Sequence, residues 1–286
     1  MMTNDAIKQA LAEGGLVETR DYVLDVRYAA GNYDRFPQLA GELAQAGASV
    51  LLTNTIAGVR AAQRLSPPVR IVMISINDPV GNGLVASLAR PGGNTTGMST
   101  LSEDLTVKLL DLVRELLPGA KSVAALFNPS NPSNPILLEK TRKAANAVAM
   151  TIIPVELKSS AMLGDAFSAI SAGHPDVLLL VPDLGTTVDL GDRIAALALA
   201  QKLPSIAIVP EYAKFGGLFG YGVSSDYLFA KSAYFVKRIF EGASPAELPV
   251  EQPTQLELAV NLKVARALGL TVPPALLARA DKVIED

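Results

Sequence analysis

The sequence predicts an α/β protein made of two lobes, each built on a doubly wound parallel sheet. Short runs rich in Val, Ile and Leu alternate with amphipathic helical patterns, which is typical of buried parallel strands connected by helices. This pattern appears twice, with a pause at "RPGGNTTGMSTLSED", residues 90–104. Because a chain of 286 residues exceeds the usual size of a single hydrophobic core, two lobes account for its length better than one.

Eight apolar runs are predicted to form the strands of the two sheets. Each run is short, consists mainly of residues that favour strands, and is followed by residues that favour turns or helix starts. In chain order the predicted strands are residues 23–29, 49–54, 71–76, 122–128, 151–157, 177–183, 205–210 and 218–223.

Amphipathic patterns between these runs predict the connecting helices. The stretch "DRFPQLAGELAQAG", residues 34–47, ends at Gly47, which suits a helix C-cap. The stretch "EDLTVKLLDLVRELLPGAK", residues 103–121, follows Ser102, a suitable N-cap. Residues 227–242 predict a further long helix.

Two places mark the boundaries between the lobes. One is the Gly- and Thr-rich pause near residue 98, and the other is "FGGLFGYGVSSD", residues 215–226. The N-terminal lobe is therefore expected to contain residues 1–98 and 224–252, and the C-terminal lobe residues 99–223 and 253–286. A chain that leaves one lobe and returns to it makes a hinge of several crossings.

The composition argues against several classes of function. The net charge of −3 and the pI near 5.4 leave no cationic surplus for a nucleic acid backbone. No apolar run is long enough to span a membrane, and the first residues do not resemble a signal peptide. The chain has no cysteine and a single histidine, His174, so disulfides, thiolate chemistry and most zinc sites are excluded, and we expect neither metal nor cofactor.

Polar side chains gather where the predicted strands end. In open α/β sheets, ligands bind outside the carboxyl ends of the strands. The polar residues at those positions are Thr53, Asn54, Thr55, Asn77, Asp78, Asn128, Ser130, Asn131, Ser133, Asn134, Asp183, Glu211 and Tyr212. Their amides and hydroxyls, with helix N-terminal amides, suit the carboxylate of a small zwitterion, while Asp78 or Asp183 suits its ammonium group.

Local structure offers an alternative role for each of these residues. Asp78 precedes Pro79 and is a natural N-cap for a helix that starts there. Asn54 and Thr55 are equally suited to capping the helix "IAGVRAAQRL".

The same choice exists in the second predicted sheet. Residues 128–132, Asn-Pro-Ser-Asn-Pro, are typical of a turn as well as of a ligand contact. Asp183 closes a buried strand, which favours a ligand role over a turn role. Tyr221 lies between two glycines and is either a wall of a binding cleft or a core residue.

No catalytic template is present. The sequence lacks G-x-G-x-x-G after a strand, a Walker-type phosphate loop and a G-x-S-x-G nucleophile elbow. We therefore expect a protein that is not an enzyme. The main alternative is a doubly wound enzyme, such as a sugar-nucleotide transferase, with Asp78 and Asp183 as acid, base or metal ligands. A third hypothesis, the effector-binding half of a transcription regulator, lacks a helix-turn-helix segment and basic charge.

Several stretches together resemble one bacterial family. They are "DPVGNGLVASLARPGGNTTGMS", "YAAGNYDRFPQLAGELA", "LLDLVRELLPGAKSVAALFNPSNP", "FGGLFGYG" and "LPVEQPTQLELAVNLKVARALGLTVPPALLARADKVIE". In order and content they are similar to ABC-transporter substrate-binding proteins of the type whose known ligands include tryptophan, tyrosine and related amino acids. The resemblance covers nearly the whole chain.

This resemblance implies a type I periplasmic-binding-protein fold, in which a ligand is clamped between two hinged lobes. It also implies ABC permease subunits as partners, a periplasmic or other extracytoplasmic location, and no cofactor. The family's ligand-binding positions map onto Asn54, Thr55, Asn77, Asp78, Asn128, Asn131, Ser133, Asp183 and Tyr221.

One departure from the family concerns the N-terminal lobe. Family members begin with an export signal and a first strand of the "IGFL" kind, whereas this sequence matches only from the first helix onward. That strand is expected in the middle of the sheet, between residues 23–29 and 49–54. Because unpaired backbone groups are costly, we predict that residues 23–29 pair directly with 49–54, or that exposed edges pair with another copy in an edge-paired or strand-swapped dimer.

Overall fold

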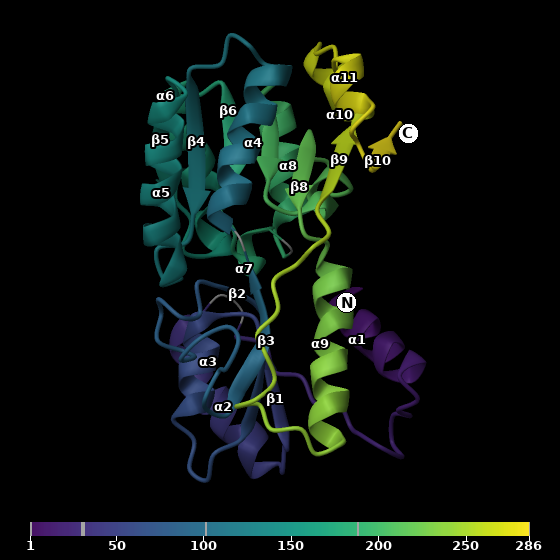
Figure 1. The fold of residues 1–286 in the computed structure, drawn as a ribbon. Coiled ribbons are helices and arrows are strands. Elements are labelled where there is room, and N and C mark those ends of the chain that lie inside the picture. Colours follow the sequence, from purple (N-terminus) through teal and green to yellow (C-terminus); the bar gives the residue numbers. More distant parts are fainter. Residues whose placement is uncertain (1, 30–31, 101, 188, 286) are drawn as a thin grey trace. The chain divides into compact units, whose positions relative to one another are not determined.

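Helices and parallel strands alternate along the chain in the structure, a computed structural model that describes residues 2–29, 32–100, 102–187 and 189–285 (Figure 1). The fold class predicted from the sequence is confirmed. The chain divides into two units: unit 1 comprises Met1–Leu101 and Ser225–Thr254, and unit 2 comprises Ser102–Ser224 and Gln255–Asp286.

Unit 1 is built on a three-stranded parallel sheet in the order β1-β2-β3. The strands are β1 (Val50–Thr53), β2 (Arg70–Asn77) and β3 (Thr95–Thr100). The helices are α1 (Met2–Glu13), η1 (Tyr33–Arg35), α2 (Phe36–Gln45), α3 (Ile56–Gln63) and α9 (Ser225–Phe240). Figure 1 shows α2 and α3 on one side of the strands and α1 and α9 on the other.

Unit 2 is built on a seven-stranded sheet in the order β10-β9-β8-β7-β6-β4-β5, in which only β8 and β9 pair antiparallel. The strands are β4 (Ser122–Phe127), β5 (Thr151–Glu156), β6 (Val177–Leu180), β7 (Ser205–Ala207), β8 (Phe219–Gly222), β9 (Glu257–Asn261) and β10 (Lys282–Ile284). The helices are α4 (Ser102–Leu116), α5 (Ser133–Ala147), η2 (Ser160–Met162), α6 (Leu163–Gly173), α7 (Leu184–Thr187), α8 (Gly191–Ala200), η3 (Pro210–Ala213), α10 (Leu262–Leu268) and α11 (Pro274–Leu277).

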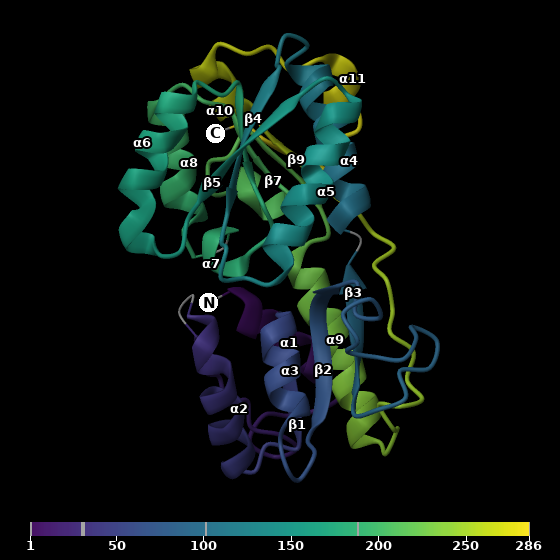
Figure 2. The ribbon, with the colours of Figure 1, turned by 90° about the vertical axis from the view of Figure 1, so that its left-hand side faces the viewer.

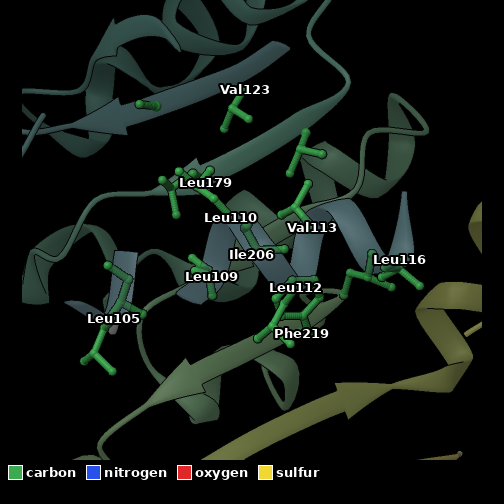
Figure 3. Close-up of a cluster of buried hydrophobic side chains, with 14 of the residues drawn as sticks. Leu105, Leu109, Leu110, Leu112, Val113, Leu116, Val123, Leu179, Ile206 and Phe219 are labelled. Carbon is green, nitrogen blue, oxygen red and sulfur yellow. The ribbon is translucent and has the colours of Figure 1, made fainter. Parts of the chain in front are cut away.

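Both faces of the unit 2 sheet are covered by helices. Figure 2 shows α6 and α8 on one side and α4 and α5 on the other. On the α4 side, Leu109 and Val113 are fully buried and pack among side chains from the sheet that include Ile206 and Phe219 (Figure 3). Burial of each such side chain contributes about 1.5–3 kcal/mol to the free energy of unfolding. This core therefore holds the strand ends in a fixed register.

Residues 23–29 do not form the strand predicted from their apolar run. The structure has no regular secondary structure there, and the side chains of Val23 and Tyr28 are 79% and 67% exposed. Among the described residues, β1 pairs only with β2. The predicted pairing of residues 23–29 with 49–54 is therefore wrong. A strand pattern alone forms no ladder, because each strand needs a neighbour within hydrogen-bonding distance.

The segment after Asp78 also differs from the prediction. Residues 79–90 form turns rather than a helix. Asp78 has a positive φ of 44°, which is incompatible with a helical start, and Gly81 and Gly83 disfavour helix.

Residues 95–100, which were predicted to be a pause between lobes, form β3. The threonines of this stretch favour strands. Gly97 lets the backbone approach β2 closely, because a Cβ at this position would lie 2.2 Å from the Met73 carbonyl oxygen.

Helix ends follow local sequence rules more closely. Gly47 has a φ of 88° and follows Ala46, which is the C-cap of α2. The glycine predicted as the cap therefore lies one position beyond it, where a left-handed residue commonly ends a helix. Helix α4 begins at Ser102, but the side chain predicted to cap it lies outside the described part of the structure. No helix in the described residues is long and apolar enough to cross a membrane.

Candidate functional site

The carboxyl ends of the central strands of unit 2 lie at one edge of the sheet. The pairing places Leu126, Leu180, Ala207 and Gly220 in one row across β4, β6, β7 and β8. Asn128, Asp183 and Tyr221 follow that row by two, three and one residues. At about 3.3 Å per residue, they leave the sheet within roughly 10 Å of one another along the strand direction.

The loop after β4 is held together by two asparagine side chains. The Ser130 backbone N–H donates to Asn128 Oδ1, and the Ser133 N–H donates to Asn131 Oδ1, both at 3.0 Å. Asn128 and Asn131 are 3% and 8% exposed. Asn131 therefore satisfies an N–H at the start of α5, as the turn interpretation predicted.

Asp183 connects this loop to the end of β6. Its Oδ2 accepts a 2.9 Å hydrogen bond from Asn131 Nδ2, while its Oδ1 accepts from the backbone N–H and the hydroxyl of Thr186 at 3.0 and 3.2 Å. The residue is only 7% exposed. Three donors therefore stabilise the charge of a buried carboxylate, which also caps α7.

Asn134 joins the same two loops, the one after β4 and the one after β6. Its Oδ1 accepts from the Asn128 N–H at 2.9 Å, and its Nδ2 donates to the Pro182 carbonyl at 2.8 Å. The side chain is fully buried. The sequence placed Asn134 at a strand end, but nothing in the local pattern distinguished it from its neighbours as the residue that joins two loops.

A second carboxylate, Asp189, lies close to Asp183. Partial withdrawal from water, and next the negative charge of Asp183, raise the pKa of Asp189 although it remains exposed to solvent. No hydrogen bond or ion pair joins Asp189 to another described residue. The sequence analysis did not single it out, because it follows no strand directly. This edge of unit 2 therefore has a negative potential that favours a cationic group.

The two tyrosines at this edge have different environments. Tyr221 is half-buried and packs against the same core cluster as Phe219. Tyr212 is fully buried, and its hydroxyl donates to Ser205 Oγ at 3.0 Å. Burial raises the pKa of Tyr212 well above its usual value. Tyr212 is therefore a neutral core residue, whereas Tyr221 keeps solvent-accessible surface.

In unit 1, the residues after β1 belong to a helix start. Thr55 is the N-cap of α3, because its Oγ1 accepts from the Gly58 N–H at 3.0 Å. A Cβ at Gly58 would lie 2.1 Å from Thr53 Oγ1, so glycine is needed for this close packing. The half-exposed Asn54 side chain makes no hydrogen bond to another described residue, and its amide is available to a ligand.

The residues after β2 form a tight turn. The exposed Asp78 accepts a 2.9 Å hydrogen bond from the Gly81 N–H through Oδ1. Asn77 is half-buried, and its side chain has no hydrogen-bond partner among the described residues. Because Thr53 lies opposite Met73 in the sheet, β2 continues four residues, about 13 Å, beyond β1. Asn54 and Asn77 therefore lie at different positions along the strand direction.

The predicted site residues thus form separate groups. Asn131 and Asp183 contact each other through side chains, and Asn128 and Ser133 belong to the same bonded loop. Tyr221 lies two strands away from β6 in the same sheet.

Among the described residues, no group of three His, Asp or Glu side chains could hold a metal ion. The carboxylates of Asp78 and Asp183 are engaged by backbone N–H groups. What the two edges do offer is amides, hydroxyls and carboxylates for hydrogen bonding to a small polar molecule.

Comparison with known proteins identifies relatives along the whole chain. A family model described as "ABC transporter substrate binding protein" matches residues 1–284. A tyrosine-binding protein from Clostridioides difficile (strain R20291) is 26% identical over 263 residues, which are 92% of this chain and 75% of that protein.

Solved structures share the fold. A protein described as a conserved domain protein from Vibrio cholerae O1 biovar El Tor is 27% identical, with a TM-score of 0.89 over 98% of this chain and 94% of that one. An ABC domain in complex with L-Trp from Streptococcus pneumonia is 21% identical, with a TM-score of 0.84 over 99% of this chain and 95% of that one.

Proposed function

Because the chain belongs to the family of ABC transporter substrate-binding proteins, we propose that it binds an amino acid or a related small carboxylate for delivery to ABC permease subunits. Tyrosine is the first candidate, since a relative that aligns with 92% of the chain is named for binding it. Tryptophan is the second, because it occupies a protein of the same fold.

The observation that supports this proposal most is the polar chemistry of the strand ends. We propose that the ligand contacts come from Asn54, Thr55, Asn77, Asp78, Asn128, Asn131, Ser133, Asp183 and Tyr221. The unpartnered amides of Asn54 and Asn77 suit a carboxylate. The carboxylate of Asp78 or Asp183 suits an ammonium group. The half-buried ring of Tyr221 suits an aromatic side chain, which matters because the chain has no tryptophan.

The proposed role is binding without turnover. Asp78 and Asp183, the carboxylates on which an enzyme mechanism would depend, each accept hydrogen bonds from backbone N–H groups. We propose a periplasmic or other extracytoplasmic location on the basis of the family alone.

A thermal-shift screen followed by calorimetry tests the function. The panel contains the common amino acids, tyrosine and tryptophan included, and aromatic carboxylates. A ligand at 100 times its Kd should stabilise the protein by about 2.7 kcal/mol. Stabilisation by tyrosine or tryptophan, with the ligand recovered unchanged, supports the proposal. Chemical conversion of a bound ligand would favour the enzyme alternative, and no stabilisation by any amino acid or carboxylate would contradict the ligand class.

We further propose that the outer edge of β1 pairs with another copy of the chain. Among the described residues β1 pairs with β2 alone, and the buried Leu51 lies on this edge strand. Unpaired strand edges readily recruit another strand. Sedimentation velocity over a hundredfold range of concentration tests this association, with protection of residues 50–53 from hydrogen exchange as a second measurement. A monomer at every concentration would contradict the dimer.

A further inference from the structure

The turn after β2 holds Asp78 in an unusual backbone conformation. Its φ of 44° places it in the left-handed region, which non-glycine residues rarely adopt. The residue directly follows a strand with a buried end, since β2 ends at Asn77 and Ile76 is 1% exposed. Such conformations persist only where the surroundings enforce them, and they occur often at functional sites.

The carboxylate of Asp78 is oriented through one of its two oxygens. Oδ1 accepts from the Gly81 N–H at 2.9 Å, whereas Oδ2 accepts from no described residue. A Cβ at Gly81 would lie 2.1 Å from Oδ2 and 2.7 Å from Cγ. The carboxylate therefore lies directly over Gly81, and only a residue without a side chain leaves it room there.

Asn82 fixes the backbone on the other side of the turn. Its Nδ2 donates to the carbonyls of Asn77 and Asp78, at 3.2 and 2.9 Å, and its N–H donates to the Asp78 carbonyl at 3.0 Å. One side chain thus holds the carbonyls of both residues at the tip of β2.

The turn is also anchored to the rest of unit 1. Gln63 Nε2, at the end of α3, donates to the Leu84 carbonyl at 2.8 Å and to Thr95 Oγ1 at 2.9 Å. Arg60 Nη2 donates to the Asn82 carbonyl at 3.3 Å. Leu84 is buried in the core of the unit. The turn is consequently fixed to α3 and β3.

We propose that Gly81 and Asn82 are positioning residues that present Asp78 Oδ2 to the ammonium group of an amino acid ligand. The inference rests on the proposed function, and it adds a specificity: the ligand must carry a cationic amine. Simple capping of the turn uses Oδ1 alone, whereas Oδ2 of this exposed residue accepts no hydrogen bond from a described residue.

Calorimetry with paired ligands tests the proposal. The probes are L-tyrosine and its analogue without the amine, 3-(4-hydroxyphenyl)propanoate. Gly81→Ala displaces the carboxylate, and Asp78→Asn removes its charge. Each is expected to weaken tyrosine binding about tenfold, as for a lost charge-assisted hydrogen bond, while the analogue binds with unchanged affinity. Asn82→Ala should act in the same direction.

The matched control is Gly93→Ala, because a Cβ at Gly93 meets nothing within 4 Å. It should bind both probes as the parent does. Equal weakening of both probes by Gly81→Ala would assign the residue a structural role only and would overturn the inference. If Asp78→Asn weakens tyrosine binding and Gly81→Ala does not, the positioning role is wrong while the ligand contact stands. Unchanged tyrosine binding in Asp78→Asn overturns both the ligand contact of Asp78 and the positioning role of Gly81 and Asn82. Absence of tyrosine binding by the parent overturns the inference together with tyrosine as the ligand.

Discussion

Asn131 and Asp183 follow different strands, β4 and β6, yet the Asn131 amide donates a 2.9 Å hydrogen bond to Asp183 Oδ2. The two residues are 52 positions apart in the chain, and both are buried. This bond joins the two loops that carry most of the proposed ligand contacts of unit 2. The strength of the bond therefore affects both the stability of the unit and the shape of its polar edge.

Asn131→Ala is expected to destabilise unit 2 by about 1–3 kcal/mol, because it leaves a buried charged acceptor without one of its donors. Urea denaturation followed by circular dichroism measures the change. Asn146→Ala, an exposed position in α5, is the control and should stay within about 0.5 kcal/mol of the parent. Equal stability of the two variants would mean that the Asn131–Asp183 bond contributes nothing net.

Asp189→Asn is expected to stabilise the protein without ligand at pH 7. The folded-state pKa of Asp189 lies above its ordinary value of 3.8, so the fold disfavours the charged form. The contribution of protonated Asp189 to the free energy of unfolding is fully present below the unfolded-state pKa. It is lost as pH rises through the folded-state pKa. The amide variant avoids that loss.

The difference in urea midpoint between Asp189→Asn and the parent should be positive at pH 7 and should disappear near pH 3, where both side chains are neutral. Asp111→Asn, an exposed position in α4, controls for the change in net charge. A gain that persisted at pH 3 would show that ionisation of Asp189 is not its cause.

Asp176→Asn is expected to act in the opposite direction. The Lys121 N–H, followed by the hydroxyl and N–H of Ser122, holds the pKa of Asp176 below its usual value. The stability from this carboxylate is present above the unfolded-state pKa of about 3.8 and is lost as pH falls through the lower folded-state pKa. The variant should therefore be less stable than the parent at pH 7 and nearly equal to it below pH 2.

Urea midpoints at several pH values measure the effect of Asp176. Ser122→Ala removes one of the three donors to the carboxylate and should lower the urea midpoint at pH 7 by less than Asp176→Asn does. If Asp176→Asn matched the parent at neutral pH, the two backbone donors would be satisfied equally well by the amide oxygen.

Thr55→Ala is expected to cost about 1 kcal/mol, since it removes the N-cap of α3. Thr55→Ser keeps the hydroxyl and should restore most of the stability. Calorimetric ligand binding by the serine variant separates the two roles of this residue. Binding equal to the parent in Thr55→Ala, despite lowered stability, would remove Thr55 from the ligand contacts.

Several features of this protein follow from local sequence. The runs at residues 71–76 and 122–128 coincide closely with β2 and β4 because they are apolar and bounded by turn residues. Gly47 ends α2 because glycine adopts a positive φ without strain. The polar strand ends are equally local, since the carboxyl ends of parallel strands share one edge of the sheet.

Other features were decided only by the tertiary structure. Residues 23–29 have a strand pattern but no strand beside them, while residues 95–100 lack apolar character but lie against β2. Likewise, the sequence placed Asp183 at a strand end, but its partner Asn131 comes from another loop. Strand pairing and the bonds of buried side chains depend on residues distant in the chain. For that physical reason the sequence by itself determined where polar groups follow strands, and the tertiary structure decided which of them bond to each other and which remain available to a ligand.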